Sequence, residues 1–229
     1  MEKKEFKQCF KSQIETLVER FNSRQIVIEY SKNIANIKFM NETVGKIEFK
    51  FLTGKQLSMG AIASIFITAN VFGGEIWKEI LECTEFRKKD SNIYTNYLYS
   101  FYSSLSNNNL FKGSKTDFFS YDNIEEKLSS FFDFISEELL SKIFNILMKR
   151  AMAIDDILNT PHYYGQPEIS MLLLCRDNPQ ELSLSAIEED KRFRNSSGIN
   201  KRIWEENKTV VFYSQNEIVG DCSKKILGL

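Results

Sequence analysis

The change in hydrophobic period near residue 23 constrains the fold more than any other feature of the sequence. Residues 4–22 place apolar side chains, from Phe6 to Phe21, at steps of three and four, which predicts one amphipathic helix of about five turns. From residue 25 to residue 51 the pattern instead alternates at every second position, as in strands with one buried face. Polar breaks at residues 31–33 and 41–43 fit hairpin turns, so we expect an antiparallel meander.

The next segments continue the sheet and then become harder to assign. Residues 61–72 are rich in Ile, Phe and Ala, which favours a central strand buried on both faces and ended by Gly73-Gly74. Residues 75–86 indicate a short helix, whereas residues 93–105 are compatible with a helix or a strand. The polar residues 107–115 are typical of a loop between lobes.

A run without glycine or proline dominates the second half of the chain. From Asp122 to Thr160, apolar residues recur at helical spacing, and Asp122 with Glu125 resembles a capping box. One long helix and two helices joined near Lys149 are both compatible with the pattern, and Pro161 ends it. Beyond it we expect a helix over residues 168–175, a charged segment of unclear helicity over 185–207 and a short strand over 209–213.

These elements predict an α+β fold with an N-terminal helix, an antiparallel β-meander and a mainly helical C-terminal half. The sheet is expected to pack against the first helix and the long helical run. We expect a lobe of helix and sheet over residues 1–112 and a mainly helical lobe over 113–229, packed together as one domain. A chain of 229 residues is long enough to form such a core without disulfides.

Charge and hydropathy argue against a nucleic-acid binder, a secreted protein and a membrane protein. The chain has 30 Lys and Arg against 31 Asp and Glu, and this balance argues against a nucleic-acid binder, which needs an excess of cations. The charged N-terminus shows no signal peptide, and the apolar run at residues 61–72 is shorter than the roughly 20 residues that span a bilayer. We therefore expect a cytoplasmic protein that does not enter a membrane.

Four distant cysteines are expected to be free thiols, namely Cys9, Cys83, Cys175 and Cys222.

Few residues could support catalysis. His162 is the only histidine, and a thiol mechanism would pair it with Cys175 and with Asp155 or Asp156. Cys175 follows Met-Leu-Leu-Leu, which favours a buried structural thiol. The acidic residues 188–190 precede a basic segment and fit a solvated helix face better than a metal site. No glycine-rich phosphate loop is present, so we expect no catalytic residue, cofactor or metal.

The most unusual segment runs from Asn92 to Tyr102 and is crowded with tyrosines. Tyrosine combines a large apolar ring with a hydroxyl group, and it is enriched at the centres of protein interfaces. Core packing explains most such runs, because several tyrosines on one element seldom all face water. As the candidate contact surface we select these tyrosines with the acidic residues that precede them, that is Tyr94, Tyr97, Tyr99, Tyr102, Glu79, Glu82 and Glu85.

In general character the chain resembles the bacterial immunity proteins that neutralise polymorphic or contact-dependent toxins. The resemblance covers the whole chain and concerns its size, its lack of motifs and its Lys-, Ile- and Asn-rich composition, not a shared motif. It implies a non-catalytic protein that forms a tight complex with a cognate toxin domain. A secretion or effector chaperone is an alternative, because a helix followed by a meander also occurs there, and an enzyme with an unrecognised carboxylate or Cys/His site is another. The sequence leaves the oligomeric state open.

Overall fold

The computed structural model describes residues 2–23, 25–52, 63–85, 97–102, 118–119 and 124–212. The chain divides into two compact units, each built from two stretches of sequence. Unit 1 comprises residues 1–73 and 99–144, and unit 2 comprises residues 74–98 and 145–229. This division differs from the boundary after residue 112 that the sequence suggested. Of the described residues, 74–85 and 97–98 group with the C-terminal helices, and 124–144 group with the sheet.

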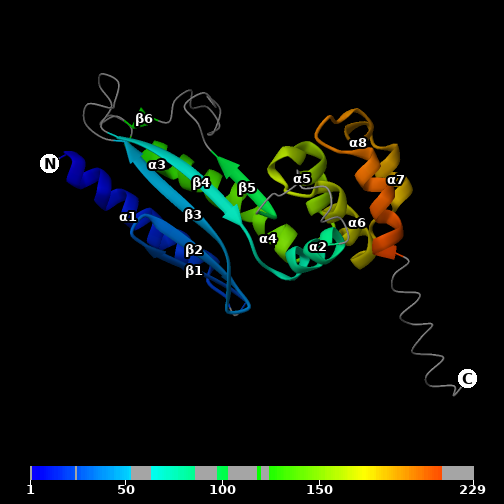
Figure 1. Cartoon of the computed structure of the whole chain (residues 1–229). Coiled ribbons are helices and arrows are strands. Elements are labelled where there is room, and N and C mark those ends of the chain that lie inside the picture. The colour runs from blue at the N-terminus through cyan, green and yellow to red at the C-terminus, as the bar shows by residue number, and fades with distance from the viewer. Residues whose placement is uncertain are drawn as a thin grey trace, which may run out of the picture. The chain divides into compact units, whose positions relative to one another are not determined.

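Unit 1 is built around an antiparallel sheet that follows the predicted meander (Figure 1). The strand order is β1-β2-β3-β4-β5, and the short strand β6 also pairs with β4. The two-residue turns Lys32-Asn33 and Met40-Asn41 join the first three strands, and all four residues have the positive φ angles of hairpin turns. The strand bounds are β1 Ile26–Ser31, β2 Ile34–Phe39, β3 Glu42–Leu52, β4 Ala63–Val71, β5 Tyr99–Tyr102 and β6 Phe118–Phe119.

One face of this sheet, the inner face, carries the core of unit 1. Its side chains are buried and lie opposite one another across the strands, as in the row of Ala35, Ile47, Ala69 and Phe101. The N-terminal helix α1 (Glu2–Phe21) packs against this face, and helix α3 (Ile124–Asp133) packs beside α1 with its Phe131 ring against Phe49 of β3. Phe10 of α1 makes ring contacts with Phe49, Phe51, Tyr30 and Phe132. The predicted packing of sheet and helices is therefore confirmed.

The long apolar run contains several helical segments. Helix α3 continues as a π-helix, η3 (Phe134–Leu140), which is followed by α4 (Ser141–Leu147) and α5 (Ala153–Asn159). A turn at Lys149, whose φ of 51° lies in the left-handed region, separates α4 from α5. The alternative with a break near Lys149 is thus confirmed. Asp122, the predicted cap, lies outside the described residues.

Unit 2 is helical in its described part. Gly74, with a φ of 94°, follows β4, and helix α2 (Glu75–Glu85) begins directly after it. The remaining elements are η4 (Pro161–Tyr163), α6 (Pro167–Asp177), α7 (Leu184–Glu189), α8 (Lys191–Asn195) and an α-helix over residues 201–212. The helices expected at residues 75–86 and 168–175 are confirmed.

The strand predicted over residues 209–213 is wrong, because residues 209–212 are the last turn of helix 201–212. The β-branched Thr-Val-Val segment favoured a strand locally. Over a longer window, however, Trp204, Asn207 and Val211 recur at helical spacing, and all three are buried. The burial of that helical face outweighs the local β propensity. Tyr213 lies outside the described residues.

The ambiguous segment over residues 93–105 contains β5, so its described part forms a strand. The expected loop at residues 107–115 lies outside the described residues. Within the described part of the chain, no helix is both long and apolar enough to cross a membrane.

Candidate binding surface

The outer face of the unit 1 sheet carries two rows of side chains that run across all five main strands. In the first row, Glu29, Asn36, Lys46, Asn70 and Ser100 lie directly opposite one another from β1 to β5. In the second row, Ser31, Ile34, Glu48, Thr68 and Tyr102 do the same. We call these ten residues the outer-face rows. They are mostly polar, whereas the residues that alternate with them form the apolar inner face.

The polar groups of the outer-face rows are largely paired with one another. Ser100 Oγ donates a hydrogen bond to Asn70 Oδ1 over 2.9 Å, and Asn70 is buried. Lys46 forms an ion pair with Glu48, two residues along β3 on the same face. Lys38 Nζ, beside the first row, contacts Glu29 Oε1 at 2.6 Å. Each charged side chain of the outer-face rows thus lies in an ion pair.

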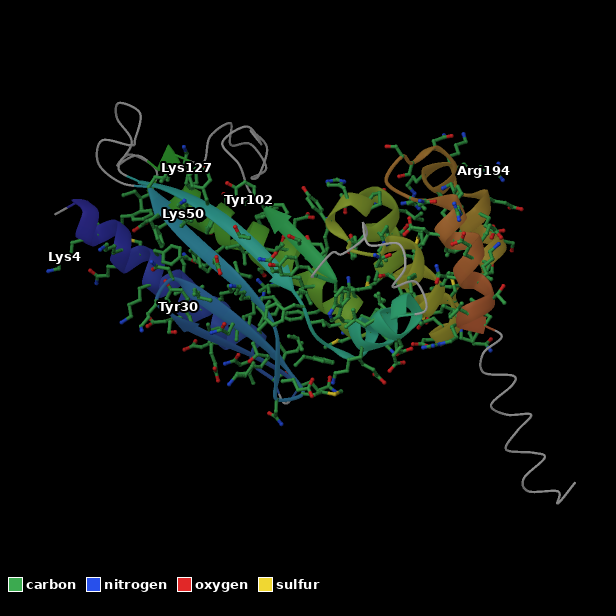
Figure 2. The ribbon with its side chains drawn as sticks, viewed as in Figure 1. Lys4, Tyr30, Lys50, Tyr102, Lys127 and Arg194 are labelled. Carbon is green, nitrogen blue, oxygen red and sulfur yellow. The ribbon has the colours of Figure 1, made fainter. Side chains whose placement is uncertain are left out.

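Tyr102 adds an aromatic group to this polar surface. Its side chain lies on β5 opposite Thr68 and is 58% exposed. Figure 2 labels Tyr102 and Lys50 on the strands of unit 1. Lys50 is exposed and follows Glu48 by two residues on β3, which places it on the same face. Tyrosine is enriched at protein-binding surfaces.

The structure separates the tyrosines that the sequence grouped. Tyr99 and Tyr102 lie three residues apart on β5 and therefore point to opposite faces, and Tyr99 is only 1% exposed in the inner-face core. Tyr97 belongs to unit 2 and is 37% exposed. Tyr94 lies outside the described residues. Of the predicted tyrosines, Tyr102 is the one on the outer-face rows.

The acidic residues of the predicted surface lie on α2 in unit 2. Glu79 accepts hydrogen bonds from Lys149 and, at 2.5 Å, from Arg176 Nη2. Lys149 Nζ also contacts Asp177 Oδ2 at 3.0 Å, and Arg176 Nε donates to Asp177 Oδ1 at 2.7 Å. We call Glu79, Lys149, Arg176 and Asp177 the charge cluster. Glu82 is exposed, and Glu85 is the last residue of α2.

The charge cluster connects α2, the turn after α4 and α6, so it has a clear structural role within unit 2. Burial opposes the charge of Asp177, but hydrogen bonds from Arg176 and Lys149 outweigh it and hold the pKa of this carboxyl below its usual value. Burial likewise opposes the charge of Lys149, but Glu79 and Asp177 raise its pKa above the ordinary value. The Glu79 carboxylate is therefore engaged in ion pairs inside unit 2.

The thiol and imidazole of the enzyme hypothesis lie in unlike surroundings. Cys175 is buried on α6, and burial raises its pKa to about 12, so the thiol is protonated at neutral pH. His162 is exposed in η4 and packs against the Tyr163 ring, with ring centroids 4.2 Å apart. Asp155, the candidate orienting group, instead contacts Arg192 Nη2 at 2.8 Å.

The acidic residues 188–190 likewise serve local structure. Glu188 Oε1 accepts a hydrogen bond from Trp204 Nε1 at 2.8 Å and pairs with Lys208, and the bond from Lys208 is the main reason that its pKa is lowered. Asp190 caps α8 by accepting from the Arg192 amide at 2.7 Å. Among the described residues, no group of three or more His, Cys, Asp or Glu side chains is arranged to hold a metal ion.

The sequence contained a usable signal for most of the outer-face rows. The polar residues that alternate with apolar ones over residues 25–51 are the outer positions of β1 to β3, among them Glu29, Asn36 and Lys46. Thr68 and Asn70 interrupt the apolar pattern of β4 at alternate positions for the same reason.

A comparison with protein-family models, curated proteins and solved structures finds no match to this chain.

Proposed function

We propose that this chain acts by binding a protein partner and that the outer-face rows are the contact surface. In the form that the resemblance to immunity proteins suggests, the partner is a cognate toxin domain, which the chain neutralises in the bacterial cytoplasm. The observation that carries the proposal is the outer face itself. Its polar rows cross five strands, their charged members lie in ion pairs, and Glu29, Ser31 and the aromatic Tyr102 are exposed in them.

Physical considerations favour a protein partner over a small ligand. A sheet face held by a packed helical layer presents its side chains on a rigid backbone, so little conformational entropy is lost on binding. Binding a partner removes water from charged side chains, which costs free energy. This cost is smaller for charges that already lie in ion pairs than for isolated charges. Lys46, Glu48 and the exposed Tyr102 can give specificity through complementary charge and hydrogen bonding.

The decisive experiment exchanges charges without changing their number. The double variant Lys46→Glu with Glu48→Lys keeps an ion pair on β3 but reverses its direction on the outer face. The matched control, Lys11→Glu with Glu15→Lys, reverses an exposed pair on α1 whose atoms lie 3.6 Å apart. Each is co-expressed with the candidate toxin domains found in the gene's neighbourhood, and growth and the dissociation constant are measured.

We expect the β3 exchange to weaken the complex by about tenfold or more and to reduce growth, since like charges would face each other across the interface. The α1 exchange should leave both measurements unchanged. Equal affinity of both variants would reject the outer face as the contact surface. Failure of the unmodified chain to bind or protect against any toxin domain encoded nearby would reject the function.

The enzyme alternative is tested independently. A Cys175→Ala, His162→Ala double variant that keeps full biological activity would exclude a catalytic role for the thiol and imidazole. The buried, protonated thiol of Cys175 leads us to expect that result.

A further inference from the structure

Strand β1 is an edge of the described sheet, so one side of its backbone faces away from β2. The two-residue turn Lys32-Asn33 makes Ser31 and Ile34 a hydrogen-bonded pair. In an antiparallel pair every second residue bonds to the neighbouring strand, so the backbone groups of Glu29 and Val27 also point toward β2. The backbone groups of Ile26 and Ile28 point the other way. Unpaired groups at a sheet edge are a template for a strand from another chain.

The chain itself pairs with both outward amides and with the Ile26 carbonyl. Asn22 Oδ1 accepts a hydrogen bond from the Ile28 amide at 2.7 Å. Ser23 Oγ accepts from the Ile26 amide at 3.1 Å, and the Ser23 amide donates to the Ile26 carbonyl at 2.7 Å. The Asn22 amide in turn donates to the Val18 carbonyl at 3.0 Å, which anchors this segment to the end of α1.

The occupied part of β1 is also the part most prone to pair with another strand. It reads Ile26-Val27-Ile28, three β-branched residues with high strand propensity and no charge. The strand then continues with Glu29, and the turn after it contains Lys32. Both residues are exposed and charged, and such charges at a sheet edge discourage a strand of another chain from pairing there. The hydrogen bonds from Asn22 and Ser23 thus cover the stretch that charge does not protect.

We infer that Asn22 and Ser23 form an edge guard that prevents β1 from pairing with β1 of a second copy of this chain. In an antiparallel pair centred on Ile28, the Ile28 amide of each copy would donate to the Ile28 carbonyl of the other. In the single chain, the Ile28 amide donates to Asn22 Oδ1 instead. A second copy would therefore have to displace the Asn22 side chain before its strand could pair. Without these two side chains the Ile26 and Ile28 amides are open, while the backbone bond from residue 23 to the Ile26 carbonyl remains. An edge opened around Ile28 is self-complementary and closes into a twofold dimer.

The test uses the full chain with Asn22→Ala and Ser23→Ala together. At low concentration, NMR should show the Ile28 amide exchanging about fivefold to tenfold faster than in the unmodified chain, because its acceptor is lost. At about 100 μM, sedimentation should show twice the mass of the unmodified chain's species, with Ile28 protected again. The control Asn22→Asp keeps an acceptor for the Ile28 amide and should behave as the unmodified chain does.

Two results would overturn the inference. Unchanged exchange at Ile28 in the double variant would mean that Asn22 does not hold the amide. Faster exchange without any change in mass would mean that the open edge does not pair. If the double variant loses the circular dichroism spectrum of the unmodified chain, the same two measurements on Asn22→Ala alone decide the question.

Discussion

The charge cluster of unit 2 gives a quantitative prediction for Glu79→Ala. The substitution removes two charge-assisted hydrogen bonds, from Lys149 and Arg176, and each such bond contributes about 1.5–3 kcal/mol. A fully buried pair costs about 3–5 kcal/mol to break. Here the four side chains are 16–24% exposed, and both cations keep Asp177 at 2.7–3.0 Å, so water and Asp177 recover part of the loss. We expect a loss of about 2 kcal/mol in the free energy of unfolding.

Urea unfolding, followed by circular dichroism at 222 nm, measures this loss. The matched control is Glu82→Ala, which removes an exposed carboxylate from the same helix and should change stability by less than about 0.5 kcal/mol. A double-mutant cycle with Arg176→Met should give a coupling energy of about 1 kcal/mol or more. If Glu79→Ala costs no more than Glu82→Ala, the charge cluster does not stabilise unit 2 and the reasoning fails.

The pH dependence of this stabilisation follows from the direction of the pKa shift of Asp177. Because its pKa is lowered in the folded chain, its contribution is fully present above the ordinary value of 3.8 and is lost as the pH falls through the folded value. Asp177→Asn should therefore be less stable than the unmodified chain at pH 7. The difference between the two should shrink when unfolding is repeated below pH 3.8. A constant difference over this range would contradict the ion pairing of Asp177.

Three further substitutions and one chemical probe test other parts of the structure. Lys149→Gly should be more stable than Lys149→Ala by about 1 kcal/mol, because both lose the ion pairs but only glycine relieves the positive φ; equal urea midpoints would contradict this. Met40→Gly should raise the melting temperature or leave it unchanged, since Met40 is 60% exposed at a φ of 49°; a lower value would show that its side chain stabilises the fold. Ser136→Ala should be neutral or up to about 1 kcal/mol stabilising, because the buried Ser136 hydroxyl has no hydrogen-bond partner among the described residues; a loss above that size in urea unfolding would refute it. Cys175 should react with a disulfide reagent at pH 8 only as fast as the chain unfolds, since burial raises its pKa to about 12, and rapid modification of the native chain would be inconsistent with that burial.

The local pattern of the sequence was sufficient for the first half of the fold. The helical spacing from Phe6 to Phe21 and the alternation over residues 25–51 gave α1 and the three-strand meander, because both elements have one face buried against the same core. The second hairpin turn lies at Met40-Asn41, one residue before the predicted polar break. A methionine at a left-handed position is not a turn signal that composition reveals.

Tertiary contacts decided the parts that the sequence did not predict. The strand expected at residues 209–213 is a helix because Trp204, Asn207 and Val211 are buried on one helical face. Units 1 and 2 each combine distant stretches of sequence, and no local pattern encodes such a grouping. Tyr99 and Tyr102 separate to opposite faces because the ambiguous segment is a strand there and not a helix.

The most direct test of the proposed binding surface is the exposure of Tyr102 in a complex with the proposed toxin partner. Hydroxyl-radical labelling of the free chain should modify Tyr102 readily, because its side chain is 58% exposed. In the complex, we predict that modification of Tyr102 falls severalfold while modification of Met152, an exposed residue of unit 2, is unchanged. Undiminished labelling of Tyr102 in a fully formed complex would contradict the claim that the outer-face rows bind the partner.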